Sequence, residues 1–591
     1  MLILGLNAYH GDSSACLLED GKLIAAVEEE RFLRVKHWAG FPLEAIRWCL
    51  KEAKASLSDL ERVAINSDPK AQFLQKMGYT FKQRPDVKLI LDRIRNRQER
   101  AGVEQELTES FSGQLFSGQI HRIEHHLAHL ASAHWASPFN NSVVISVDGF
   151  GDFSSAAWGI GQGGQLFLDE RILFPHSLGV FYQAFTQYLG FPKYGDEYKV
   201  MGLAPYGEST YLEALRDVVS LEEEGGYSLN LNYFRHHNEK VFYEWNGREP
   251  SVGNLFKTES LQELTGFGPR NREDPLEQHH KDLAHSVQAM YEEAFFHLLK
   301  HCHQKYHEEC LSLAGGCAMN SVANGKVYLR SPFNKVYVQA AAGDAGGAIG
   351  AAMVVRNEIS KERPSPMHHA YLGPKFGDGE IKELLHEHQS TLEEQHCSVR
   401  FIEDDQKLCD FTAKQIAEGF VVGWFQGCME WGPRALGNRS ILCDPRRKDM
   451  KDILNHKIKR RESFRPFAPS VLREDANNWF EIDTDSPYMM LIVDIDKSHQ
   501  KTSQEKNETF GFDKLNVLRS DIPAVTHVDY SARVQTVHKE TNPLYHALIS
   551  KFKELTNMTK EMSNLENQQV QKENRWLELT EMEETTNNAN E

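Results

Sequence analysis

Two histidines spaced four residues apart are the first feature of the sequence that could carry chemistry. His125 and His129 lie in the stretch RIEHHLAHLASAHW. In a helix, residues at i and i+4 share one face, with Cβ atoms about 5–6 Å apart. Neutral imidazoles at this spacing suit two ligands of one metal ion, such as iron or zinc. The alternative is that both histidines only belong to a polar helix face.

Two aspartates elsewhere in the chain could complete such a site. Asp148 ends a strand-like run in SVDGFGD, and Asp344 lies in AAGDAGGA. A carboxylate buried at a strand end is costly unless a cation or hydrogen bonds satisfy it. A site with two histidine and two carboxylate ligands would satisfy both aspartates. The alternative is that each aspartate caps a turn.

Four loops of small residues follow apolar, strand-like runs: YHGDSS, DGFGDFSS, AGGCAMN and GDAGG. Glycine lets backbone N–H groups approach an anion, and a following helix adds the positive end of its dipole. The sequence contains neither the G-x-x-x-x-G-K-[ST] phosphate loop nor a G-x-G-x-x-G dinucleotide motif after a strand. The loops therefore predict a nucleotide held between two lobes.

A group of cationic residues gathers in the second half of an otherwise acidic chain. The net charge is −18, which makes nucleic-acid binding an unlikely role. Guanidinium groups match phosphate with two parallel hydrogen bonds, so the group predicts a local anion site. The alternative is a set of surface ion pairs. The cationic residues are Arg434, Arg439, Lys459, Arg460, Arg461 and Arg465.

The elements that must position these residues follow a repeated plan. The opening MLILGLNAYHGDSSACLLEDGKLIAAVEE reads as three strands separated by turns, and residues 142–173 repeat this order. A glycine-rich region from residue 311 adds further strands and helices. We therefore predict an α/β fold with a duplicated unit and not a doubly wound Rossmann sheet.

The chain of 591 residues is too long for one hydrophobic core, so we expect separate domains. The first spans 1–356 and is followed by a linker at 357–374. The second spans 375–555 and begins with a helix stopped by Gly419 and a buried strand. The acidic tail, 556–591, is expected to be disordered or a frayed helix.

Composition also limits the location of the protein. The nine cysteines are scattered without a C-x-x-C pair, which favours a reducing cytoplasm over a disulfide framework. No apolar run reaches the roughly 18 residues that a membrane span needs. The sequence does not indicate an oligomeric state.

Taken together, these motifs resemble the NodU/CmcH family of O-carbamoyltransferases. The resemblance covers nearly all of residues 1–555 in the same order. It rests on YHGDSSACLLEDGKLIAAVEEERFLRVKHWAGFP, EHHLAHLASAHWASPF, VDGFGD, SLGVFYQAFTQYLGF, DEYKVMGLAPYG, GGCAMNSVANGKV, GDAGGAIGAA, WGPRALGNRSIL and RRESFRPFAPSV.

The resemblance implies a fold and a reaction. The N-terminal domain would have the ASKHA fold of actin, sugar kinases and Hsp70, and the smaller C-terminal domain would be YrdC-like. The C-terminal domain would use ATP with Mg to convert carbamoyl phosphate to carbamoyl adenylate. The N-terminal domain would pass the carbamoyl group to a hydroxyl of a small molecule. Residues 208–285 could shape the acceptor pocket.

The resemblance also implies roles for individual residues. His125, His129, Asp148 and Asp344 would hold the metal, usually Fe(II), although Zn or Mn also suits these ligands. His10 and Lys36 would lie beside the acceptor or the carbamoyl group, with His10 as a candidate general base. The residues at the nucleotide would be Gly315, Gly316, Asn320 and Gly343. The residues at carbamoyl phosphate and the ATP phosphates would be Arg434, Lys459, Arg461, Arg465 and Arg533.

The C-terminus departs from the family pattern. Family members usually continue after NPLYHALISKFKELT with an apolar strand and an LNTSFN-type loop, whereas this chain has the acidic tail. We therefore expect a truncated second domain. Two alternatives stay open on these grounds: an ASKHA-type ATPase or phosphotransferase, and a catalytically impaired relative that binds nucleotide and metal.

Overall fold

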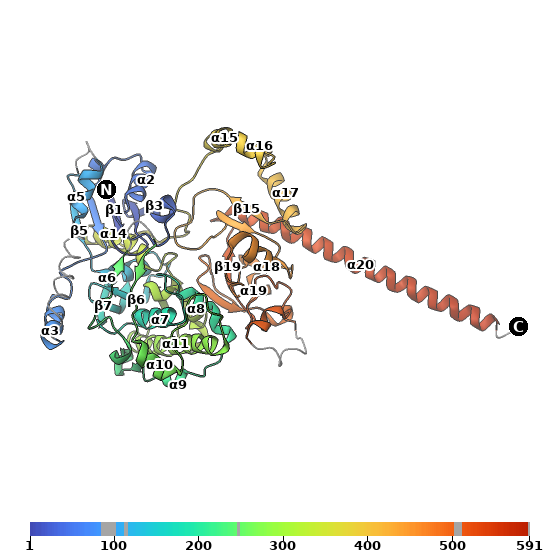
Figure 1. Cartoon of the computed structure of the whole chain (residues 1–591). Coiled ribbons are helices and arrows are strands. Elements are labelled where there is room, and N and C mark those ends of the chain that lie inside the picture. The colour runs from blue at the N-terminus through green and yellow to red at the C-terminus, as the bar shows by residue number, and fades with distance from the viewer. Residues whose placement is uncertain (84–101, 112–115, 245–248, 502–510, 589–591) are drawn as a thin grey trace.

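The computed structural model describes residues 1–83, 102–111, 116–244, 249–501 and 511–588. Figure 1 shows an N-terminal part made of two α/β lobes, a smaller domain beside them, and one long helix that leads away. Among the described residues, no helix combines the length and the apolar composition needed to cross a membrane.

The first lobe is built on a five-stranded sheet in the order β3-β2-β1-β4-β5. β1 to β3 form an antiparallel meander, and β4 and β5 extend it in parallel. Asp20 and Gly21, both with positive φ, make the tight turn between β2 and β3. The strands are β1 (Leu2–Asn7), β2 (Ser14–Glu19), β3 (Lys22–Glu28), β4 (Arg62–Ile65) and β5 (Gln119–Arg122).

The second lobe repeats this plan. Its sheet has the order β14-β13-β6-β7-β8, again a three-stranded meander extended by two parallel strands. The duplicated α/β unit predicted from the sequence is confirmed. The strands are β6 (Asn141–Gly151), β7 (Ser154–Gln162), β8 (Gln165–Leu173), β13 (Cys310–Ala314) and β14 (Lys335–Val338).

Two helices fill the space between the sheets: α6 (His125–His134) and α14 (Asp344–Ser360). α14 packs on the first sheet and on α6, and α6 packs on the second sheet. The contact is close because α14 carries small residues; a Cβ at Gly350 would lie 1.8 Å from the Ala128 carbonyl oxygen. α14 continues to Ser360, so the helix extends into the predicted linker 357–374.

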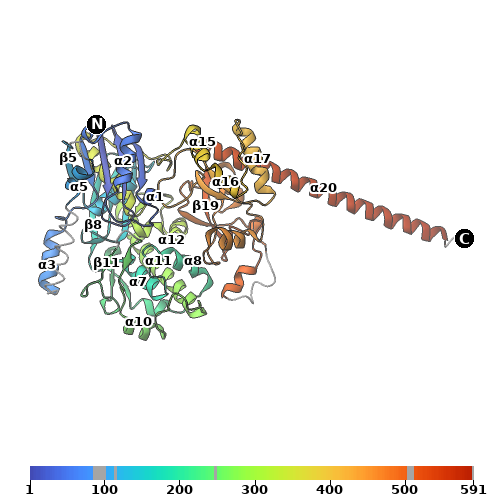
Figure 2. The same cartoon turned by 45° about the horizontal axis from the view of Figure 1, so that its top comes forward.

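The remaining elements of the N-terminal part surround these layers, and the 29-residue helix α11 crosses beneath the second sheet (Figure 2). The helices are α1 (Glu30–Leu33), α2 (Leu43–Glu52), α3 (Phe73–Gln83), α5 (Val103–Ser110), α7 (Leu178–Tyr188), α8 (Glu197–Leu203), α9 (Leu212–Leu215), α10 (Thr258–Thr265), α11 (Gln278–Tyr306), α12 (Ser321–Gly325) and α13 (Val327–Arg330). The short strands are β9 (Val219–Leu221), β10 (Tyr227–Leu229), β11 (Tyr243–Glu244) and β12 (Ser251–Val252).

The C-terminal domain contains two small sheets, β15-β16 and β17-β19-β18. Gly419, at φ +93°, lies in the turn where helix α17 stops, as predicted. The prediction of a buried strand after it is wrong, because β15 belongs to a two-stranded sheet in which only Trp424 is buried. The elements are α15 (Asp378–Glu387), α16 (Gln389–Glu394), α17 (Asp405–Ala417), α18 (Met450–Asp452), α19 (Ala476–Trp479), β15 (Val422–Phe425), β16 (Arg439–Leu442), β17 (Ser470–Leu472), β18 (Leu491–Asp494) and β19 (Ser531–Val537).

The last helix, α20 (Pro543–Asn588), begins inside this domain and leaves it. Tyr545 and Leu548 are buried against α17, and the later turns project away from the body in both views (Figures 1 and 2). The structure therefore differs from the expected disordered or frayed tail up to Asn588. Pro543 suits the first turn of a helix, and neither glycine nor proline follows it within α20.

Candidate active site

The four residues predicted to bind a metal converge between the lobes. His125 and His129 point their Nε2 atoms at each other, 3.1 Å apart. Asp148 Oδ2 lies 3.0 Å from His125 Nε2 and 3.2 Å from His129 Nε2. Asp344 Oδ1 lies 3.6 Å from both imidazole nitrogens. α6 and α14 thus bring together groups that are more than 200 positions apart in the sequence.

Local structure explains why each side chain points inward. The Glu124 carboxylate caps the start of α6 by accepting the Leu127 N–H, and Asp152 accepts the N–H of His125. Asp148 lies near the end of β6, as predicted, and its Oδ1 accepts N–H groups from Gly149 and Gly316. Asp344 differs from the prediction of a strand end, because it opens α14.

The electrostatics of this cluster depend on its burial. The His125 and His129 side chains are at most 1% exposed. Burial opposes the charged imidazolium, but the hydrogen bond with Asp148 and the charge of Asp344 raise the pKa of His125 to about 10. Burial and the nearby Asp148 charge raise the pKa of Asp344. The cluster thus concentrates imidazole and carboxylate donor atoms in one buried place.

The donor set fits one metal ion. Two imidazole nitrogens and two carboxylate oxygens form a mixed set that suits iron, zinc or manganese. Ligand bonds of about 2 Å bring donor atoms about 3 Å apart around one ion, as these atoms are. His125, His129, Asp148 and Asp344 are the first of two groups of this kind among the described residues. The second is formed by Asp12, Glu30 and His37.

The predicted nucleotide residues lie beside this cluster. Gly315 has φ +89°, and a Cβ there would lie 2.3 Å from the Val147 carbonyl oxygen. A Cβ at Gly343 would lie 4.0 Å from the Gly316 Cα, so the two glycine loops face each other. Asn320 is used structurally: its Oδ1 caps α12, and its amide bonds to Gln288.

His10 and Lys36 take different positions in the same region. His10 Nδ1 lies 4.0 Å from Asp344 Oδ2, and its ring centroid lies 5.5 Å from that of His125. Lys36 lies over the ring of Tyr198, with its Nζ 5.8 Å from the ring centroid. His10 therefore borders the four-residue cluster, whereas Lys36 points toward the second domain.

The predicted phosphate-binding arginines gather in the C-terminal domain without enough carboxylates to balance them. Burial, and then the charges of Arg434, Arg461 and Arg465, lower the pKa of Arg533 far below its usual value. Burial and Arg465 lower the pKa of Arg434 to about 10. Among the described residues, the buried Nε atoms of Arg434 and Arg533 have no hydrogen-bond partner. An anion bound here would relieve this repulsion.

The other members of the cationic group are placed differently. Burial, followed by the charges of Arg461 and Arg465, lowers the pKa of Lys459, which places Lys459 in the cluster. Arg439 lies outside it. Its guanidinium stacks on Phe425, 3.6 Å from the ring centroid, and donates to four backbone carbonyls including that of Pro374. Arg439 therefore fastens the linker to the domain.

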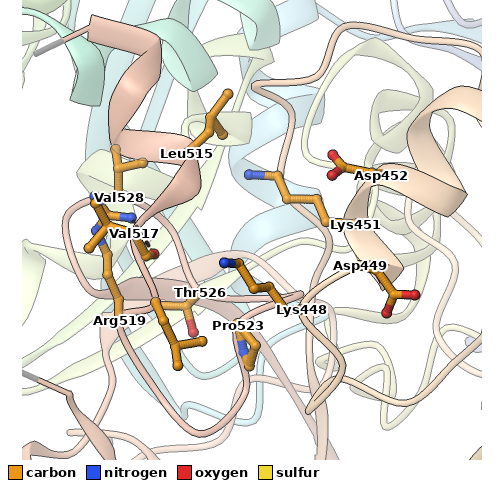
Figure 3. A pocket seen from close by; sticks show the side chains of 11 residues that line it. Lys448, Asp449, Lys451, Asp452, Leu515, Val517, Arg519, Pro523, Thr526 and Val528 are labelled. Atoms are coloured by element: carbon orange, nitrogen blue, oxygen red, sulfur yellow. Dashed lines mark hydrogen bonds between the residues drawn. The ribbon is translucent and has the colours of Figure 1, made fainter. Parts of the chain in front are cut away.

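A cavity of about 340 Å³ lies next to the arginine cluster. Figure 3 shows the amino groups of Lys448 and Lys451 directed toward the space that Arg519 also borders. Burial lowers the pKa of Lys451 to about 8. The charge of Asp452 opposes this shift, and the charges of Arg519 and Arg461 add to it. The sequence analysis missed these residues, although DPRRKDMKD continues the same run of basic residues.

The arginine cluster and Lys36 both reach Tyr198 in α8. The Arg465 guanidinium lies 4.4 Å from the centroid of the Tyr198 ring that Lys36 also approaches. An ion pair of 3.5 Å between Lys199 and Glu462 joins the domains beside this ring. The structure thus connects the predicted acceptor side of the N-terminal domain to the anion site of the C-terminal domain.

Comparison with known proteins agrees with this arrangement. Residues 2–353 match the family model described as carbamoyltransferase N-terminus, and residues 413–564 match carbamoyltransferase C-terminus. An uncharacterised protein of Synechocystis sp. is 40% identical over 571 residues, covering 94% of this chain and 89% of its own.

Two relatives with functional names also match. The nodulation protein NolNO of Sinorhizobium fredii is 35% identical and covers 93% of this chain and 73% of its own. The 3'-hydroxymethylcephem-O-carbamoyltransferase of Amycolatopsis lactamdurans is 32% identical, over 41% of this chain and 39% of its own. With both family models matched in order, the chain belongs to the carbamoyltransferase family and is a transferase enzyme.

Proposed function

We propose that this protein is an ATP-dependent O-carbamoyltransferase that works through two sites. The C-terminal domain activates carbamoyl phosphate as carbamoyl adenylate, and the N-terminal domain transfers the carbamoyl group to a hydroxyl of a small molecule. One observation carries the proposal: the arginine cluster, in which the buried Nε atoms of Arg434 and Arg533 lack partners among the described residues, reaches Tyr198 of the N-terminal domain, which Lys36 also approaches.

The C-terminal site suits two anionic substrates. Carbamoyl phosphate and ATP repel each other, and Arg434, Arg461, Arg465 and Arg533 lower that repulsion. Water first cleaves carbamoyl phosphate to carbamate and phosphate, and a carbamate oxygen then attacks the α-phosphorus of ATP while pyrophosphate leaves. The cavity beside Lys448 and Lys451 supplies space and positive charge for the ATP phosphates, with Mg as their counter-ion.

The N-terminal site suits transfer of the activated group. His125, His129, Asp148 and Asp344 would hold the metal, Fe(II) or alternatively Zn or Mn. When bound, the metal would supply Lewis-acid polarisation of the carbamoyl carbonyl. Gly315, Gly316 and Gly343 carry no side chains, which would let the adenylate approach the backbone beside the cluster. Enclosure between the domains would keep water from the activated carbamoyl group.

The acceptor belongs to the class of small hydroxylated molecules. The Amycolatopsis lactamdurans relative is named for an acceptor that carries a hydroxymethyl group, which supports an alcohol as the substrate. The free cysteines support a cytoplasmic location.

The test is to incubate the purified chain with MgATP and carbamoyl phosphate and to separate the nucleotide products. We expect AMP and pyrophosphate, and with an alcohol present a product heavier by one carbamoyl group. Release of ADP without pyrophosphate would contradict the proposal and favour an ASKHA-type ATPase or phosphotransferase. Absence of turnover, with nucleotide still bound, would favour a catalytically impaired relative.

A further inference from the structure

We infer that His37, oriented by Asp12, is the catalytic base that removes the proton from the acceptor hydroxyl; this inference rests on the proposed function. His37 Nδ1 lies 2.8 Å from Asp12 Oδ1. The sequence analysis did not single out either residue. A carboxylate on Nδ1 fixes the imidazole tautomer and leaves Nε2 as the basic atom.

The two loops that carry the dyad are held together. Ser13 N–H donates to the Trp38 carbonyl at 2.8 Å, and the Ser13 hydroxyl donates to Gly40 at 2.7 Å. The backbone N–H of His37 donates to Glu30 Oε2 at 2.9 Å. The dyad is therefore a fixed arrangement, in which Asp12 Oδ1 and Glu30 Oε2 each accept a hydrogen bond from His37.

Backbone strain marks the same two residues. Asp12 has φ +56° and His37 has φ +54°, a left-handed conformation that is uncommon outside glycine. Such conformations are found at functional sites, where surrounding contacts hold them. Both residues that form the contact between His37 Nδ1 and Asp12 Oδ1 therefore have a strained backbone. We take this as a sign that the two loops are shaped to hold that contact.

The His37 side chain is 23% exposed, and Gly195 lies beside its Nε2 atom. Gly195 has φ +80°, and a Cβ there would lie 2.4 Å from His37 Nε2. A larger residue would thus cover the nitrogen that acts as the base. Among the described residues, Nε2 has no hydrogen-bond partner, whereas the ring contacts Tyr194 edge-on at 5.4 Å. Nε2 of this partly exposed side chain is therefore the ring nitrogen that would accept the hydroxyl proton.

The position of His37 fits the transfer step. Its neighbour Lys36 lies over Tyr198, where the C-terminal arginine site begins. On the other side, Tyr194 contacts Tyr243 at 5.9 Å, and Tyr243 belongs to the predicted acceptor segment 208–285. Residues 245–248 of that segment lie outside the described residues. His37 thus stands between the source of the carbamoyl group and the acceptor segment.

His10, the base expected from the resemblance, is less well placed. It lies against Asp344 and His125, which are proposed metal ligands. His37 lies apart from those four residues. In the transfer step, His37 Nε2 takes the hydroxyl proton while the acceptor oxygen attacks the carbamoyl carbon of the mixed anhydride. The bond from that carbon to the phosphate oxygen breaks, and AMP leaves with the electron pair.

The charges around His37 set the pH dependence. Burial opposes protonation, but the charge and hydrogen bond of Asp12 raise the pKa of His37 above its usual value. A base acts only when neutral, so transfer should rise as pH increases through this pKa, above about 6.5. The titratable groups that face His37 are Asp12, Glu30, Lys36, Tyr194, Glu197 and Glu249.

The test compares two nucleophiles in the full-length protein with MgATP and carbamoyl phosphate. Glycerol at high concentration is the alcohol probe, and its attack needs a base. Hydroxylamine attacks through a neutral nitrogen lone pair and gives hydroxyurea without that help. We expect His37→Ala to lower glyceryl carbamate formation by about 10²–10⁴-fold, with hydroxyurea formation kept and added imidazole restoring part of the loss.

Further variants separate a base from a structural residue. Asp12→Asn should give a smaller loss and move the acid limb of the pH profile to lower pH. His499→Ala is the matched control, because His499 pairs with Asp521 at 3.2 Å at similar exposure and does not line the cavity beside Lys448 and Lys451; it should leave both products unchanged.

Three results would overturn the inference: unchanged transfer to glycerol in His37→Ala, equal loss of both products, or an acid limb that survives the substitution. If wild-type protein forms neither product, the proposed function itself is wrong.

Discussion

At the residue scale, the four-residue cluster is the feature that the sequence predicted best. The spacing of His125 and His129 indicated a shared helix face, and the strand-like run before Asp148 indicated its place. Asp344 was proposed as a further ligand from its glycine-rich loop, but its place at the start of a helix was not predicted, because the run AAGDAGGA does not show where α14 begins. The pairing of Asp12 with His37 was not predicted, because the two residues lie on separate loops and neither loop's sequence indicates its partner.

Removing a proposed ligand should remove the metal. We expect His125→Ala and Asp344→Ala to lose bound metal, because each leaves an incomplete donor set. Metal content per protein, measured by elemental analysis after purification, checks this. His126→Asn is the control on the same helix, since His126 bonds to Ser146. Full metal content in the two alanine variants would remove this site from the account.

Lys451 should make phosphate binding depend on pH. Burial lowers its pKa to about 8, so the amino group is charged below this pH and loses its charge as pH rises through it. We expect ATP to bind more weakly above pH 8 in the wild type, measured by titration calorimetry. In Lys451→Arg the side chain should stay charged, so ATP affinity should not fall above pH 8. Equal weakening in both proteins would show that Lys451 does not contact the phosphates.

At the element scale, the meanders and the glycine-rich loops could be predicted because each is a local pattern of strands and turns. The order of the sheets could not, since β4 and β13 reach their places through long crossovers. The prediction that β15 is buried was wrong for a related reason. An apolar run is compatible with a buried strand, but the exposure of β15 follows from the small two-stranded sheet to which it belongs.

The close contact of α6 with α14 should determine both stability and metal binding. A Cβ at Gly350 would meet the Ala128 carbonyl oxygen at 1.8 Å. Overpacking of this kind costs about 1–3 kcal/mol, so Gly350→Ala should lower the Tm and reduce metal content, measured by calorimetry and elemental analysis.

Gly379→Ala provides the matched substitution, because a Cβ there meets nothing within 4 Å on the exposed helix α15. It should leave metal content unchanged and stabilise the helix by up to about 1 kcal/mol. If Gly350→Ala matched this control in both measurements, the helix contact would not position the cluster.

At the scale of the whole molecule, the C-terminal helix has two parts with different roles. Tyr545 and Leu548 are buried in the core of the second domain, whereas every described side chain from Asn557 to Arg575 is exposed. The family likeness also ends within this helix, at residue 564. The sequence predicted a disordered tail or a frayed helix from residue 556, and the structure has a continuous helix to Asn588.

Truncations should separate these two parts. A chain that ends after residue 565 should keep its Tm and its pyrophosphate release, because the deleted turns contact little of the body. A chain that ends after residue 541 should lose the second domain's activity, because two buried side chains leave the core. Equal effects of both truncations, seen by calorimetry and by product assay, would contradict this division.

The division of labour between the domains is the central claim, and a pyrophosphate burst tests it most directly. Wild type, Arg461→Ala and His125→Ala are mixed with MgATP and carbamoyl phosphate, and pyrophosphate is followed in the first turnover. We predict that His125→Ala keeps a stoichiometric burst although transfer is lost, and that Arg461→Ala loses the burst. A burst that disappears in His125→Ala and persists in Arg461→Ala would contradict the account.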